Sequence, residues 1–298
     1  MSNTGNSNVI TRKYLDSLLI ETRYMNSCVA DQSLVLYGER FDSPIMTAAL
    51  SHLDHHFMFE GATVLYAAAA AKTGTLLWLG MAEDAEVERC IATGAKMIEV
   101  IKPYADRERI YRKIRHAESL GLLAVGIDID HPFANDGSPD VVDGYEMAAI
   151  NTAELRDLCS ASTLPLIAKG VLSTYDANEA VKAGAGGLVL SHHNNRIGYA
   201  CPPLMMLPEI KKNLEREVPL FVDCEIQTGM DAFKALALGA TAIGIGRPLM
   251  AALKKDGENG MAAYLIEVRK QLAKAMAYTG CTSLDKMDSS VIHFASWL

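Results

Sequence analysis

Two groups of polar residues in this sequence directly follow short apolar runs, and their types suit acid–base and anion-binding chemistry. His193 and Arg196 come just after the apolar run 187–190. A histidine there can take a proton near neutral pH, and an arginine three residues later can hold a carboxylate. Lys169 ends another apolar run, where its ammonium group can stabilise an anionic or enolate-like centre or form a Schiff base. Together these residues favour a site for proton transfer on an anionic ligand.

A glycine-rich turn offers a second place for an anion. The segment Gly244-Ile245-Gly246-Arg247-Pro248 ends an apolar run where a helix is expected to begin. Backbone amides at a helix start, next to an arginine, are suited to a phosphate group. More polar side chains end other apolar runs, namely Glu99, Asp128, Asp130, His131, His192, Asp223 and Glu225.

Eight β-rich runs carry these polar residues, and longer amphipathic stretches separate them. The runs are 44–49, 76–80, 96–101, 123–130, 165–170, 187–192, 219–224 and 242–246. Their ends lie 21 to 40 residues apart, which is the spacing of one strand, one helix and two loops. The pattern predicts an α/β protein, a single-domain TIM (β/α)8 barrel, whose reacting groups lie at the carboxyl ends of the strands.

Within that architecture we expect the barrel to span residues 44–298, including a C-terminal helix and tail. Residues 9–43 are expected to form a lead-in segment, and the polar residues 1–8 a disordered tail. This start lacks the basic and apolar parts of a signal peptide, and no apolar run is long enough to span a bilayer. The sequence therefore predicts a cytoplasmic protein without a membrane partner.

Charge and cysteine content narrow the functional classes. The 298 residues carry a formal net charge of −8, which argues against a nucleic-acid partner because phosphate backbones are bound by basic faces. The six cysteines are scattered without a CxxC pair, so free thiols are expected and no metal site is predicted from them. These features favour a protein of a reducing compartment without a nucleic-acid partner.

Three segments in the same order resemble one known family. Residues 164–173 read LPLIAKGVLS, which is similar to the family's LPIVVKGILT, and residues 183–196 read AGAGGLVLSHHNNR, similar to AGADGIVVSNHGGR. Residues 231–248 contain DAFKALALGA and end in GRP, as in DVFKALALGADAVGIGRP. The chain thus resembles the FMN-dependent α-hydroxy-acid oxidases and dehydrogenases, which include glycolate oxidase and lactate oxidase. The likeness runs from about Arg23 to Pro248.

The resemblance implies an oxidoreductase with FMN as its cofactor and a 2-hydroxy acid or related alcohol as its substrate. By position, His193 is the implied base, Arg196 binds the substrate carboxylate, and Lys169 lies near the N1–C2 carbonyl edge of the flavin. Tyr104 is a candidate substitute for a substrate-binding tyrosine. The positions implied to contact the cofactor are Ala48, Ala49, Glu99, Asp128, Lys169, Asp223, Gln227, Gly246 and Arg247. A homo-oligomer, a tetramer in related proteins, is implied as well.

The chain departs from the family's pattern at the phosphate segment. Cys224 and Glu225 follow Asp223 where the family has two glycines, and Gln227 replaces an arginine. An acid beside a phosphate repels it, so the sequence predicts FMN binding that is weak, shifted in pose, or absent.

Two other functions are compatible with a polar barrel mouth. One is a lyase, isomerase or hydrolase without a redox flavin, in which a divalent metal could be held by mixed oxygen and imidazole ligands. The candidate ligands are Asp128, Asp130, His131, His193 and Glu225. The other is a catalytically reduced relative that binds a ligand or another subunit.

Overall fold

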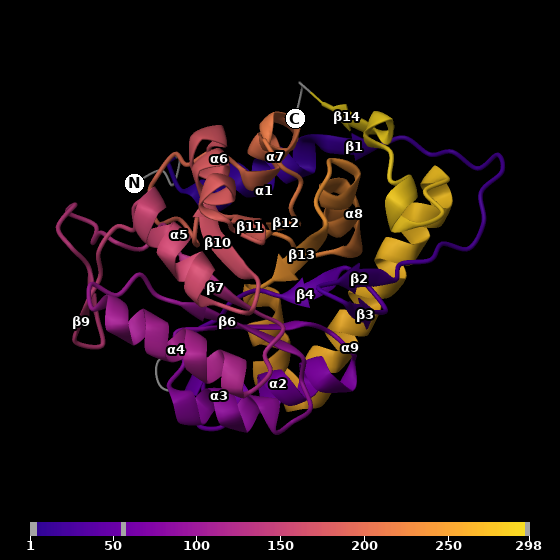
Figure 1. Cartoon of the computed structure of the whole chain (residues 1–298). Coiled ribbons are helices and arrows are strands. Elements are labelled where there is room, and N and C mark those ends of the chain that lie inside the picture. The colour runs from indigo at the N-terminus through magenta and orange to yellow at the C-terminus, as the bar shows by residue number, and fades with distance from the viewer. Residues whose placement is uncertain (1–4, 55–57, 296–298) are drawn as a thin grey trace.

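Eight parallel strands form the centre of the computed structural model, which describes residues 5–54 and 58–295 (Figure 1). In chain order they are β4 (Ile45–Thr47), β5 (Leu77–Gly80), β6 (Met97–Ile101), β7 (Ala124–Asp128), β10 (Leu166–Val171), β11 (Gly187–Leu190), β12 (Leu220–Val222) and β13 (Ala242–Ile245). Each overlaps one of the eight predicted runs. Their order in the sheet is β4-β13-β12-β11-β10-β7-β6-β5.

The two outer strands of this sheet close it into a barrel. Leu50, just after β4, forms a parallel bridge with Leu79 of β5, and the Gly80 amide donates to the Leu50 carbonyl at 2.9 Å. The predicted TIM barrel is therefore confirmed.

Helices between the strands cover the outside of the barrel (Figure 1). They are α2 (Ala62–Lys72), α3 (Asp84–Ile91), α4 (Arg107–Ser119), α5 (Thr152–Ala161), α6 (Thr174–Ala183), α7 (Pro203–Asn213), α8 (Gly229–Ala237) and α9 (Arg247–Thr279). Local signals set several of their ends: Ser173 caps α6 through the Asp176 amide, and Gly184 ends it in the left-handed conformation. None of the described helices is long and apolar enough to cross a membrane.

Strand alternation decides which side chains enter the barrel lumen. One buried cluster fills its amino-terminal part, with one or two inward residues from each strand: Met46, Trp78, Ile98, Val100, Ala124, Ile167, Val189, Phe221 and Ala242. The hairpin of β2 (Leu34–Leu36) and β3 (Glu39–Phe41) adds Leu36 and Phe41 to this cluster and so closes that end. Toward the carboxyl ends of the strands, the next inward positions include small residues, such as Ala48 and Gly244, and the polar residues Lys102, Asp128, Lys169 and Asp223.

The N-terminal segment is more ordered than the sequence predicts. Helix α1 (Ser7–Ser17) begins inside the expected tail, since Asn6 caps it and the Ser7 side chain is fully buried. Ser7 donates through its amide to Asn195 at 2.6 Å and through its hydroxyl to the Ile197 carbonyl at 2.6 Å, so the loop after β11 fixes it in place. Residues 1–4 of the expected tail lie outside the described residues.

Four further short strands and two short turns lie outside the barrel. Strand β1 (Leu18–Ile20) pairs antiparallel with β14 (Ile292–Phe294), so segments from the two terminal parts of the described chain lie side by side (Figure 1). The connection after β7 contains a hairpin of β8 (Val141–Val142) and β9 (Tyr145–Glu146). Two short 3-10 turns lie at Leu284–Lys286 and Ser289–Val291.

Candidate active site

Asp128 lies at the centre of a buried ion cluster at the carboxyl end of the barrel. It accepts a hydrogen bond from Lys102 at 2.6 Å and another from Lys169 at 2.8 Å. All three side chains are at least nine-tenths buried. Burial alone would raise the pKa of Asp128, but attraction to the two ammonium groups holds that pKa well below its usual range.

Lys169 is the inward-facing lysine that the sequence analysis selected. Burial alone would lower its pKa, but attraction to Asp128 outweighs burial and raises the pKa, so its side chain stays an ammonium group. Lys102 lies two residues beyond the inward-facing Val100, and sequence reasoning did not select it. Counting strand alternation one residue past the end of β6 was the signal that could have found it.

His193 forms the second charged pair, with Asp130. The two are joined by Nδ1 and Oδ1 at 2.9 Å, and the other Asp130 oxygen is buried with no hydrogen-bond partner in the described chain. Burial raises the pKa of Asp130, but attraction to His193 and a hydrogen bond from it lower the pKa overall. A carboxylate on Nδ1 orients the imidazole and leaves Nε2 available for a proton.

The turn that carries His193 has an unusual backbone. Three successive residues, His193, Asn194 and Asn195, have φ angles of 48°, 55° and 69°, in the left-handed region. Asparagine tolerates this region better than most side chains, which explains how two asparagines stand where the similar family motif has two glycines. A hydrogen bond from the His193 amide to the Ser191 hydroxyl, 3.0 Å long, holds the turn.

Arg196 is bound to the protein's own acid. Its guanidinium donates to Asp140 Oδ2 at 2.6 Å and also to the Phe133 carbonyl. Asp140 belongs to the long connection after β7, and the same Oδ2 lies 2.9 Å from His131 Nε2. The group expected to hold a substrate carboxylate therefore holds an internal one.

His131 connects the Asp128–lysine cluster to the Arg196–Asp140 pair, through hydrogen bonds with Lys102 and Asp140. Lys102 donates to His131 Nδ1 at 2.7 Å, so Nε2 carries the proton that points to Asp140. Burial, and then the nearby ammonium group of Lys102, lower the pKa of His131 to about 4. His131 is therefore neutral at physiological pH.

The expected phosphate segment lies on the other side of the mouth. Arg247 forms an ion pair with Glu225, whose side chain is only 8% exposed, and Gln227 donates to the second Glu225 oxygen at 3.0 Å. Cys224 and Glu225 have φ angles of 70° and 60°. For such residues the left-handed region costs about 1–2 kcal/mol each, so the chain keeps a strained turn where the family motif has glycines.

Two of the predicted site residues do not join these groups. Glu99 lies on the opposite side of β6 from the lumen, fully buried, and Lys113 of α4 donates to it at 3.1 Å. Its expected flavin contact does not fit this orientation, because inward positions in β6 are the even-numbered ones. Tyr104 packs against Arg109 and Tyr145, with ring centroids 5.6 Å apart for the two tyrosines.

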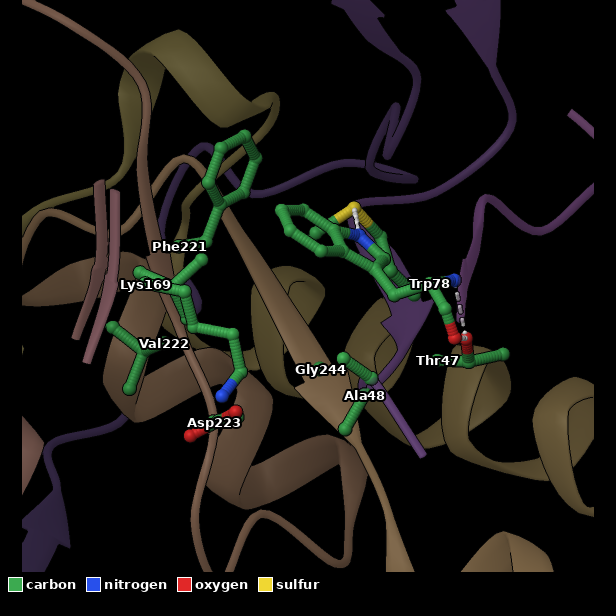
Figure 2. Close-up of a pocket in the computed structure, with 11 residues that line it drawn as sticks. Thr47, Ala48, Trp78, Lys169, Phe221, Val222, Asp223 and Gly244 are labelled. Atoms are coloured by element: carbon green, nitrogen blue, oxygen red, sulfur yellow. Dashed lines mark hydrogen bonds between the residues drawn. The ribbon is translucent and has the colours of Figure 1, made fainter. Parts of the chain in front are cut away.

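Small residues face Lys169 across the lumen. Ala48, Ala49 and Gly244 line a cavity of about 10 Å³ with Lys169 and Asp223. Figure 2 shows the Lys169 side chain reaching toward Asp223, with Ala48 and Gly244 on the opposite wall. A Cβ on Gly244 would lie only 3.3 Å from the Ala48 Cα, so this wall carries nothing larger than methyl groups.

A metal ion is disfavoured at the mouth. Ligand atoms of Asp128, His131 and His193 lie within 4.8 Å of one another, as a metal site requires. However, Asp128 and His131 already accept hydrogen bonds from lysine ammonium groups. Two positive charges in this position repel a cation, so the predicted metal-dependent alternative gains no support from the geometry.

The fold and the mouth together define a (β/α)8 barrel with a histidine–carboxylate pair at the carboxyl ends of its strands, and comparisons with known proteins identify its family. A family model described as FMN-dependent dehydrogenase matches residues 2–149 and 135–294. Glycolate oxidase of Spinacia oleracea is 30% identical over 305 residues, covering 90% of this chain and 81% of its own length. Glycolate oxidase 1 of Zea mays is 29% identical, covering 85% of this chain and 78% of its own.

Solved structures agree with this assignment. Mandelate oxidase with a monooxide FMN adduct superposes with a TM-score of 0.85 at 26% identity, covering 97% of this chain and 91% of its own. Another mandelate oxidase structure, with 4-Br-2-hydroxy-methylphenylacetate, has a TM-score of 0.88 at 25% identity, covering 98% and 92%. The chain belongs to the FMN-dependent dehydrogenase family.

The residues at the mouth fit FMN, the cofactor of this family, at the ring end. Lys169 offers a positive charge that faces the small residues Ala48, Ala49 and Gly244. At the phosphate end Arg247 is present, but Glu225 is bound to it. The two ends of the site thus differ: small side chains face the lysine at the ring end, whereas an internal carboxylate is already paired with the arginine at the phosphate end.

Proposed function

We propose that this protein is an FMN-dependent oxidoreductase that oxidises a 2-hydroxy acid or a related alcohol to the 2-oxo compound. The observation that carries the proposal is the His193–Asp130 pair, 2.9 Å apart, beside the buried ammonium group of Lys169. FMN, when bound, accepts the two electrons that leave the substrate.

His193 acts as the base in this proposal. The substrate loses two protons and two electrons as it becomes a 2-oxo compound; His193 Nε2 would take one of these protons, and the other would leave with the two electrons to FMN, when bound. The Asp130 carboxylate stabilises the resulting imidazolium, because the two groups are already hydrogen-bonded through Nδ1. Lys169 holds positive charge where the electrons arrive, which favours the reduced cofactor.

Arg196 anchors the substrate carboxylate in the same proposal. Asp140 holds that guanidinium at 2.6 Å, so a substrate must displace an internal carboxylate before it binds. Support for a carboxylate-bearing substrate comes from the charge and position of Arg196.

Anaerobic reduction of the flavin tests the proposal. The FMN-loaded protein is mixed with glycolate, lactate or mandelate, and loss of the oxidised-flavin absorbance is followed. His193→Ala is expected to slow this reduction by about 10²–10⁴-fold while the flavin stays bound. His293→Ala, which changes an exposed histidine of β14, serves as the matched control.

Two results would argue against this function. One is the absence of reduction by glycolate, lactate and mandelate alike, which would favour the ligand-binding alternative. The other is an unchanged rate in the His193→Ala variant, which would place the base elsewhere.

A further inference from the structure

The cavity at the phosphate end of the mouth is basic and lies between α1 and the start of α9. It measures about 380 Å³ and is lined by α1 and its N-cap residue on one side and by Glu225 and Arg247 on the other. Arg12, Lys13 and Arg247 line it with three positive charges; Asp16 and Asp231 pair with Arg12, and Glu225 pairs with Arg247.

Helix α9 points its positive dipole end toward the same cavity. It begins at Arg247, and its N-cap residue Gly246 provides no side-chain cap. Pro248 has no amide proton and the Leu249 amide donates to the Gly246 carbonyl at 2.9 Å, so it is the helix dipole, together with Arg247, that favours an anion here. This part of the protein is therefore built to receive negative charge.

Glu225 supplies that negative charge from within the chain. Its carboxylate pairs with Arg247, it accepts from Gln227 at 3.0 Å, and the side chain is 92% buried, since 8% is exposed. Arg12 donates to the Glu225 backbone carbonyl at 3.0 Å while it pairs with Asp231. The left-handed φ of 60° at Glu225 is unfavourable for this residue, yet it directs the carboxylate toward Arg247.

We propose that Glu225 is an internal substitute for the phosphate group of the cofactor, so that Glu225 and FMN compete for Arg247. This proposal rests on the proposed function, because it requires a flavin at the mouth. Its consequence is a change of ligand preference: the site gains little from a terminal phosphate and binds a flavin with an uncharged ribityl end about as well as FMN.

Riboflavin is the probe that isolates this effect, because it differs from FMN only by the phosphate group. Dissociation constants for both flavins are measured by fluorescence quenching, without any turnover. For the wild-type protein the two constants are expected to agree within about threefold. Glu225→Gln keeps the size of the side chain and removes its charge.

In Glu225→Gln, FMN is expected to bind at least about tenfold more tightly, while riboflavin changes by less than about twofold. Glu225→Gly, which also relieves the backbone strain, is expected to show the same selective gain. Adding Arg247→Gln to Glu225→Gln removes the gain if Arg247 is the group that phosphate contacts. Glu209→Gln, an exposed acid on α7, is the matched control.

The possible outcomes separate the two proposals. If both flavins bind but Glu225→Gln leaves their affinity ratio unchanged, the internal-phosphate proposal is wrong and the proposed function stands. A wild-type protein that already prefers FMN by about 100-fold or more also overturns it. If neither flavin binds to any folded variant, checked by circular dichroism, both proposals fail together.

Discussion

Replacing Asp128 by asparagine removes the one carboxylate that neutralises both Lys102 and Lys169. Each lysine is 4% exposed, so neither ammonium group can turn to water without rearrangement. Removing one partner of a buried ion pair costs about 3–5 kcal/mol. Releasing a proton from one lysine at pH 7.4 instead costs about 4 kcal/mol, because the usual lysine pKa lies three pH units higher. Keeping both lysines charged and deprotonating one of them thus cost similar free energies, so the expected loss of stability is the same by either route.

The expected loss in melting temperature follows from the chain length. Unfolding entropy is about 2.1 cal/mol/K per residue, or about 0.6 kcal/mol/K for 298 residues. A loss of 3–5 kcal/mol therefore lowers the melting temperature by about 5–8 °C. Thermal and urea unfolding followed by circular dichroism measure it, with Asp157→Asn, an exposed acid on α5, expected to stay within about 0.5 kcal/mol.

A pH series tests whether charge is the cause. In Asp128→Asn a buried lysine has a lowered pKa, so the unfolded chain binds more protons and stability rises with pH. The loss in free energy of unfolding, relative to the wild type, should shrink by up to about 1.4 kcal/mol per pH unit above pH 7. Adding Lys102→Met should recover part of the loss. A deficit below about 1 kcal/mol, or one independent of pH, would refute this reasoning.

Three further changes act on the same mouth. Gly170→Ala should lower the free energy of unfolding by about 2 kcal/mol or more, because Gly170 has a φ of 99° and a Cβ would lie 2.1 Å from Asp130 Cγ. Thermal melts measure this loss, and an unchanged melting temperature would contradict it. Asp140→Asn removes the internal carboxylate that binds Arg196, so KM for a 2-hydroxy acid should fall about tenfold with kcat little changed. Steady-state assays measure both constants, and an unaltered KM would count against competition between Asp140 and the substrate carboxylate. Folded His131 has a pKa lowered to about 4, against about 6.5 when unfolded, so the unfolded chain binds more protons between these values and stability falls as pH drops through that window. His131→Asn should flatten this decline in urea unfolding, and an identical pH profile would show that another group causes it.

The barrel could be predicted from the sequence because each of its units carries local signals. Strand runs, helix caps and terminating glycines repeat along the chain, as at Ser173 and Gly184 of α6. The polar ends of the runs also marked the mouth correctly: Lys169 is buried among acids there, and His193 pairs with Asp130. In both cases neighbouring residues in the sequence determine the position on the strand.

Residues whose orientation or partners depend on distant parts of the chain were harder to predict. Glu99 was expected beside the flavin, but strand alternation turns it toward α4, while Lys102 takes an inward position unnoticed. The tail expected over residues 1–8 gives way to a helix at Ser7, because partners nearly 190 residues away bind it. Such contacts leave no local pattern.

By itself, the sequence determined the eight strand–helix units, the family resemblance, and the types of residue at the strand ends. Only the tertiary structure decided the pairing of those residues: Asp128 between two lysines, Asp140 on Arg196, and Glu225 on Arg247. The physical reason is that secondary structure follows from short-range periodicity and backbone preferences. Buried charges, in contrast, are settled by whichever opposite charges the closed barrel brings within hydrogen-bonding distance.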